Sequence, residues 1–173
     1  MPRDFLKHSV CSALPATAAV LALAACGRPD AKAHDDLVGA WRAQVQFTSG
    51  AFAAVKDLEF MYVFNEGGTM TESSNYDAAP PVPPAYGVWR RTGSDEFEAR
   101  YEFYVTRPPA TADEILSSGG WLPAGRGVFT ERITMAPDGK TFRSEMRYEA
   151  LDSAGQPAEG SGEATVSGVR VTF

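Results

Sequence analysis

Residues 96–105 read Glu-Phe-Glu-Ala-Arg-Tyr-Glu-Phe-Tyr-Val and alternate polar with apolar side chains over most of their length. Successive side chains of a β-strand point to opposite faces, so this alternation predicts a strand with one buried and one solvated face. The buried face carries Phe97, Ala99, Tyr101, Phe103 and Val105. A half-buried strand is typical of an antiparallel sheet that packs on a core from one side.

Similar segments lie on both sides of this strand and are separated by turn sequences. Residues 65–68 (Asn-Glu-Gly-Gly) and 137–139 (Pro-Asp-Gly) are examples, because Asn, Asp and Gly tolerate the backbone angles of tight turns. The predicted strands cover residues 37–48, 58–64, 69–75, 86–92, 96–105, 127–135, 141–151 and 163–171. We predict an all-β domain, an eight-stranded antiparallel up-and-down barrel, because closure removes the exposed sheet edges. An open sandwich of two sheets is the alternative.

One connection, residues 106–125, is long and Pro-rich at its start, with a helical turn predicted at 111–116. Long loops inside small domains are uncommon and often functional. Ile115, Leu116 and Trp121 would give a lid over the barrel an apolar underside. The alternative is a loop that only covers one end of the core.

The N-terminus has the composition of a secretory signal. Arg3 and Lys7 precede an apolar run, residues 10–25, which is too short for a comfortable membrane span. The run ends Leu-Ala-Ala-Cys at residues 23–26. This ending resembles the lipobox of bacterial lipoproteins, which implies cleavage before Cys26 and a lipid such as palmitate on its sulfur. An ordinary signal peptide with a chance cysteine, or a buried apolar helix, is the alternative.

The expected organisation is a signal peptide at 1–25, a lipidated tether at 26–36 and a barrel domain at 37–173. A lipid on Cys26 would make the membrane a partner without any spanning segment. The resemblance implies a place in the cell envelope, on the periplasmic or extracellular face. Gly27 follows the cysteine where an inner-membrane lipoprotein often has Asp, so the outer membrane is favoured if the host has one.

Composition excludes several kinds of chemistry. The chain has 16 Lys and Arg against 22 Asp and Glu, a net charge of −6 with the signs interspersed, which argues against nucleic-acid binding. The two cysteines are Cys11 and Cys26, so the domain is expected to lack a disulfide and a thiol nucleophile. The two histidines are His8 and His34, too few for a histidine-based zinc site, haem site or Ser-His-Asp triad. We therefore expect no metal and no cofactor.

The domain resembles a lipocalin-like (calycin) barrel. The resemblance rests on Gly39-Ala40-Trp41 at the start of the first strand and on Arg170 in the last one. It implies that Trp41 plugs one end of the barrel and that Arg170 packs across the indole as a cation. The later motifs of lipocalins have no clear counterpart here, so the resemblance bears on the fold more than on the function.

The leading hypothesis for the function is a binding module, because an eight-stranded barrel can hold one small ligand. We predict a small apolar or amphipathic ligand. Aromatic and soft side chains at inward positions are the candidate contacts, although each of them can equally be plain core: Phe60, Tyr62, Tyr101, Phe103, Met146 and Tyr148.

Two other functions remain open. The barrel can be filled with side chains and serve a protein partner through its surface. Less readily, it can be a cofactor-free isomerase or cyclase that uses Glu131, which shares a face with Phe129 and Ile133. A carboxylate among apolar groups has a raised pKa and can act as a base. Alternatively, Glu131 lies in water or pairs with Arg91 or Arg132.

Overall fold

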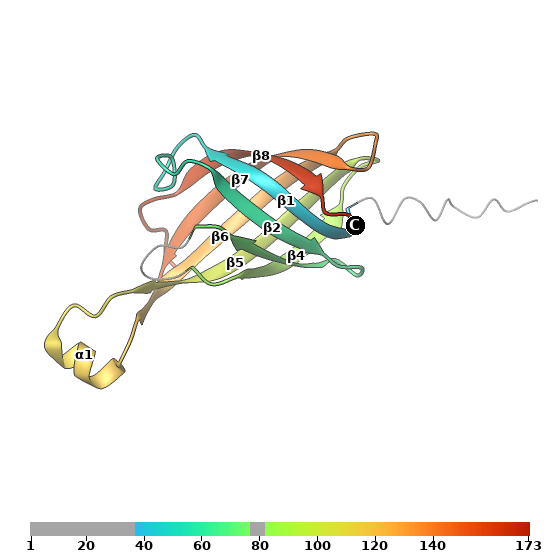
Figure 1. The fold of residues 1–173 in the computed structure, drawn as a ribbon. Coiled ribbons are helices and arrows are strands. Elements are labelled where there is room, and N and C mark those ends of the chain that lie inside the picture. Colours follow the sequence, from blue (N-terminus) through green and yellow to red (C-terminus); the bar gives the residue numbers. More distant parts are fainter. Residues whose placement is uncertain (1–36, 77–81) are drawn as a thin grey trace, which may run out of the picture. The chain divides into compact units, whose positions relative to one another are not determined.

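Eight strands close into an antiparallel barrel in the computed structural model, which describes residues 37–76 and 82–173 (Figure 1). Each strand pairs with the next one along the chain, and the last pairs back onto the first. The strands are β1 (Gly39–Phe47), β2 (Leu58–Phe64), β3 (Thr69–Ser74), β4 (Ala85–Arg91), β5 (Glu96–Arg107), β6 (Leu122–Met135), β7 (Thr141–Asp152) and β8 (Gly162–Arg170), with helix α1 (Ala112–Ser118) between β5 and β6. The predicted up-and-down barrel is confirmed, and the alternative of an open sandwich is wrong.

The apolar and polar side chains that alternate along each strand point alternately into and out of the barrel. On β5, Phe97, Ala99 and Tyr101 are buried, while the intervening residues face outward and are more exposed. Two glycines also face inward and make room for rings. A Cβ on Gly127 would lie 2.3 Å from the Phe103 ring, and one on Gly168 would lie within 2.1 Å of the Phe142 ring. The interior is therefore filled by aromatic side chains that lie directly against the backbone.

The barrel has two ends of different character. We call the end where β1 begins the Trp41 end, and the end where β1 finishes the Phe47 end. The C-terminus lies at the Trp41 end, whereas α1 projects from the Phe47 end (Figure 1). The candidate functional site lies at the Phe47 end.

The predicted connection of residues 106–125 needs correction. β5 and β6 remain paired as far as Arg107 and Leu122, beyond a register shift between Val105 and Thr106. Ladder hydrogen bonds join backbone groups whatever their side chains, so pairing continues where the alternation has ended. This two-stranded extension carries α1 away from the barrel (Figure 1).

The predicted signal peptide at 1–25, the lipidation site Cys26 and the tether at 26–36 lie outside the described residues. Within residues 37–76 and 82–173, none of the helical structure has the length and apolar character needed to cross a membrane.

Candidate functional site

A buried carboxylate lies at the centre of the barrel. β6 turns Glu131 inward between Phe129 and Ile133, and its side chain is fully buried. The hydroxyls of Tyr62 and Tyr101 donate to its Oε2 over 3.2 and 3.0 Å. Ser144, from β7, donates to Oε1. The sequence-based hypothesis that placed Glu131 among apolar neighbours holds, and its partners are hydroxyls from three other strands.

These hydroxyls determine which charge state of Glu131 the core tolerates. Burial raises the pKa of Glu131, while the donors Ser144, Tyr101 and Tyr62 act in the opposite direction because they stabilise the ionised form. The two tyrosine oxygens lie 3.3 Å apart, but each phenol has a single proton to donate. When both donate to Glu131, the contact between the two phenols cannot also be a hydrogen bond. Burial raises the pKa of both tyrosines well above its usual value, so they remain donors at neutral pH.

A second carboxyl, that of Glu72, lacks any such support. β3 directs Glu72 inward, and the residue is 5% exposed. Among the described residues, its Oε1 is the buried side-chain oxygen that has no hydrogen-bond partner. Burial, and secondly the charge of Glu131, raises the pKa of Glu72 to about 8. Buried polar groups are nearly always partnered, so an orphaned carboxyl oxygen needs an explanation.

The Glu72 side chain borders a small cavity at the Phe47 end of the barrel. Aromatic rings form most of its wall: Phe47, Phe52, Phe60, Tyr76, Phe103 and Phe129. The cavity measures about 20 Å³. One water requires about 10–15 Å³ on this scale, so the cavity holds a group of roughly that size. Its outer wall is formed by the half-buried Phe52, Tyr76 and Val82, which lie outside the strands.

The six residues predicted to contact a ligand lie in three different environments. Phe60 and Phe103 line the cavity. Tyr62 and Tyr101 bind Glu131, and Tyr101 also contacts the sulfur of Met146 at 3.9 Å. The ring of Tyr148 stacks on that of Phe103 with centroids 6.2 Å apart. All six are buried, and the middle of the barrel is packed with side chains rather than hollow.

Trp41 and Arg170 meet at the opposite end. The guanidinium carbon of Arg170 lies 4.2 Å from the centroid of the Trp41 ring. Arg170 also donates to the backbone oxygens of Val38 and Gly139, over 2.6 and 2.9 Å. The indole nitrogen of Trp41 donates to the Leu37 oxygen at 2.9 Å. These contacts tie the chain entering β1 to the end of β8, and the role of Trp41 and Arg170 as a plug of this end stays a prediction.

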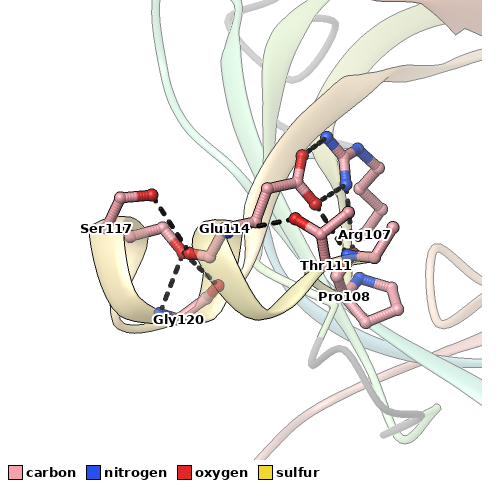
Figure 2. A network of polar contacts seen from close by, with 8 residues as sticks. Arg107, Pro108, Thr111, Glu114, Ser117 and Gly120 are labelled. Atoms are coloured by element: carbon pink, nitrogen blue, oxygen red, sulfur yellow. Dashed lines mark hydrogen bonds and ion pairs between the residues drawn. The ribbon is translucent and has the colours of Figure 1, made fainter.

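Helix α1 is held by polar contacts rather than by packing (Figure 2). The side-chain oxygen of Thr111 accepts from the backbone N–H of Glu114. The carboxylate of Glu114 accepts from the backbone N–H of Ala110 and forms an ion pair with Arg107 at 2.8 Å. This arrangement resembles a capping box, except that Glu114 reaches the N–H of the residue before the N-cap Thr111. The helix has no buried residue, and the side chains of Ile115 and Leu116 are exposed, as is Trp121 beyond it. The lid formed by these three residues stays a prediction.

Other surfaces of the described residues are less specific. A wider depression of about 810 Å³ lies on the outer face of β5 to β8, and its wall includes the exposed side chains of Glu96, Arg132 and Glu145. Within residues 37–76 and 82–173, no group of three or more His, Cys, Asp or Glu side chains is placed to hold a metal ion. The cavity beside Glu72 is therefore the candidate site.

Sequence reasoning missed Glu72, Phe52 and Tyr76 as site residues. A signal for Glu72 exists, because Met70 and Glu72 share one face of a short strand, as they do in the observed β3. Phe52 and Tyr76 lie outside the strands, where periodicity says nothing about direction.

No protein-family model matches this chain, and no curated protein matches it.

Proposed function

We propose that this chain is a lipid-anchored protein of the bacterial cell envelope whose calycin-like barrel binds a small amphipathic molecule at the Phe47 end. The anchor is the lipid on Cys26, with the outer membrane as the favoured location. The ligand places a polar group beside Glu72 and an apolar part against the surrounding rings.

The observation that carries this proposal is that Glu72, whose buried Oε1 has no hydrogen-bond partner among the described residues, lines an aromatic-walled cavity. Leaving a buried polar group without a partner costs about 1–3 kcal/mol, and more for a charged one. A ligand that donates a hydrogen bond to Glu72 recovers this free energy on binding. Glu131 offers no comparable site, because its oxygens already have three donors and no exposed surface.

The filled interior supports a site at the end of the barrel rather than deep inside it. A drug-sized ligand fills a pocket of about 300–1,000 Å³, far above the size of this cavity. Only the polar head of a ligand fits beside Glu72 without rearrangement. The rest of the ligand contacts the half-buried Phe52, Tyr76 and Val82 at the outer wall of the cavity.

Calorimetric titration with short amphiphiles that share a hexyl chain tests this function. We expect saturable binding of at least one member among neutral, cationic and anionic head groups. Tyr76→Ala should weaken that binding about tenfold or more, because it removes a wall of the site. Tyr86→Ala is the matched control, since Tyr86 is 66% exposed on the outer face. Absence of saturable binding for every head group would contradict the proposal.

Cys26 provides the test of the anchor. We expect Cys26→Ala to abolish incorporation of labelled palmitate and to release the protein from the membrane fraction. Cys11→Ala is the control and should change neither property, because Cys11 lies within the predicted signal. Lipid incorporation that persists in Cys26→Ala would refute this anchoring.

A second function, surface action on a protein partner, is favoured by the outer face of β4 and β5. Tyr86, Val88 and Tyr104 are exposed there as large apolar side chains. A photo-cross-linker at residue 86 should then give one defined protein adduct in the intact envelope. The same probe at Arg147, an exposed position on β7, is the control and should give none.

A further inference from the structure

We propose that the group bound beside Glu72 is a primary ammonium, so that the ligand is a small alkyl or aryl amine. This inference rests on the proposed function, the binding of a small molecule at the Phe47 end. It adds the chemical class of the ligand's head group.

The charges around the cavity favour a cation. Glu72 is the one Asp, Glu, Lys or Arg among the described residues of the cavity wall, and its Oε1 has no partner there. Glu131 adds a second carboxyl nearby, and its charge acts on Glu72. No lysine or arginine lies among the described lining residues, so these residues offer an anionic head group no cationic partner.

The aromatic wall favours a cation as well. The rings of Phe47, Phe52 and Tyr76 follow one another, with centroids 5.2 Å apart between the first two and 5.7 Å between the last two. Aromatic faces attract an ammonium group electrostatically, and the attraction is strongest where water is excluded. A carboxyl and several rings around one small space are the groups that recognise an amine.

The size of the cavity decides between kinds of ammonium. A volume of about 20 Å³ is close to that of one water, and a –NH₃⁺ head has about the same size. A trimethylammonium head carries three methyl groups and is too large. A primary ammonium also has three N–H donors, of which one can satisfy the carboxyl of Glu72, and Ser74 is a further polar residue of the wall.

Proton linkage gives this class of ligand a characteristic dependence on pH. The pKa of Glu72 is about 8 because of its burial, so the carboxyl is mostly protonated at pH 7. Among the described residues, the titratable groups that act on Glu72 or are acted on by it are Glu131, Tyr62 and Tyr101, and none of these is a cation. An ammonium stabilises the ionised carboxylate, so binding releases a proton. The affinity should rise about tenfold per pH unit up to pH 8 and then level off until the amine itself deprotonates near pH 10.

The test is calorimetric titration of the full chain with hexylamine, 1-hexanol and hexyltrimethylammonium at pH 8. We expect hexylamine to bind at least tenfold more tightly than the other two. Between pH 8 and pH 6 its affinity should fall by tenfold or more. Measurement in two buffers of different ionisation enthalpy should show a proton released at pH 7.

Glu72→Gln separates the charge of this residue from its shape. Glutamine resembles the protonated carboxyl in size, so the variant should fold, which circular dichroism can verify. Hexylamine binding should fall to the level of 1-hexanol, and 1-hexanol binding should stay within twofold of its original value. Glu145→Gln is the control, because Glu145 is an exposed carboxylate on β7, and it should change neither affinity.

The remaining outcomes overturn distinct claims. If 1-hexanol binds as tightly as hexylamine and Glu72→Gln changes neither, the ammonium inference is wrong while the proposed binding function stands. Equal binding of hexyltrimethylammonium would show a cation site that does not select by size, and would refute the primary ammonium. If no compound with a hexyl chain binds, the inference and the proposed function both fail.

Discussion

At the scale of single residues, the barrel contains two buried carboxyls that the fold treats in opposite ways. Glu131 accepts from three hydroxyls on three different strands. Glu72 accepts from no described group at its Oε1. An unsupported carboxyl in a core lowers stability, whereas a fully bonded one can be tolerated. Of these two carboxyls, Glu72 is therefore the one that can still accept a hydrogen bond from a ligand.

The support of Glu131 can be measured by removing one donor. Tyr101→Phe deletes the hydroxyl that donates over 3.0 Å and leaves the ring in place. We expect the free energy of unfolding in urea to fall by about 1–3 kcal/mol at pH 7, because Glu131 loses one of its three hydroxyl donors while Tyr62 still donates to the same oxygen. Tyr104→Phe is the control, because Tyr104 is exposed on the same strand and should have no comparable effect. Equal stabilities of all three proteins would contradict a supporting role for Tyr101.

Glu72 should impose a pH dependence on stability. An ordinary glutamate ionises near pH 4.5, but Glu72 in the folded protein ionises near pH 8. Between these values the native state keeps a proton that the unfolded chain has lost, so the free energy of unfolding falls by about 1.4 kcal/mol per pH unit. Above pH 8 the decline from this group is complete.

Glu72→Gln removes that decline. We expect the variant and the natural protein to have similar stability at pH 4, and the variant to be the more stable at pH 9. Urea unfolding at several pH values measures the difference between the two proteins. Parallel curves from pH 4 to pH 9 would show that Glu72 ionises normally in the fold.

At the scale of elements, glycines that face the interior leave room for aromatic rings of neighbouring strands to pack directly against the backbone. Gly127→Ala places a methyl group 2.3 Å from the Phe103 ring and 2.8 Å from that of Tyr148, so one of them must move. We expect a loss of about 1–3 kcal/mol in the free energy of unfolding, typical of overpacking. Because Phe103 lines the cavity, ligand binding should weaken as well. Gly120→Ala is the control, since an added Cβ at Gly120 contacts nothing within 4 Å. Unchanged stability of Gly127→Ala would mean that the rings adjust freely.

At the scale of the whole molecule, two parts differ in how they are stabilised. The barrel rests on a continuous aromatic core, whereas α1 buries no residue and depends on its caps and on the ion pair of Arg107 with Glu114. Regions with few buried contacts open locally at low free energy. We therefore expect α1 to open without the barrel.

Hydrogen exchange measures this separation. Arg107 and the backbone N–H of Ala110 lower the pKa of Glu114 to about 2, so its stabilising charge is present above pH 4.5 and is lost as the pH falls towards 2. Glu114→Gln should speed exchange of the Gly119 amide, which donates to Ile115, and leave the amides of β7 protected. Glu149→Gln, on the barrel wall, should leave α1 unchanged. Simultaneous loss of protection in α1 and the barrel would refute the separation.

The sequence predicted the architecture well because the barrel depends on local periodicity. Period-2 alternation assigned most strands to within a few residues and turned Phe97 and Tyr101 inward. For Glu131 it left open a position in water or beside an arginine, and the structure shows that this alternative is wrong. The alternation ended β5 too early at Val105, because backbone pairing does not require alternating side chains. The resemblance to a lipocalin-like barrel, and not the alternation, singled out Trp41 and Arg170, which lie in contact in the structure.

The sequence by itself predicted eight antiparallel strands and which side chains share a face of the sheet. Closure of these strands into a barrel, rather than an open sandwich, was decided by the tertiary structure. Only the tertiary structure decided that the middle of the barrel is filled, that Glu131 meets hydroxyls from three strands, and that Glu72 borders a cavity. Alternation specifies the face of the sheet on which a residue lies. It does not specify which residue lies across the closed barrel, because that depends on how strands distant in the sequence pack together.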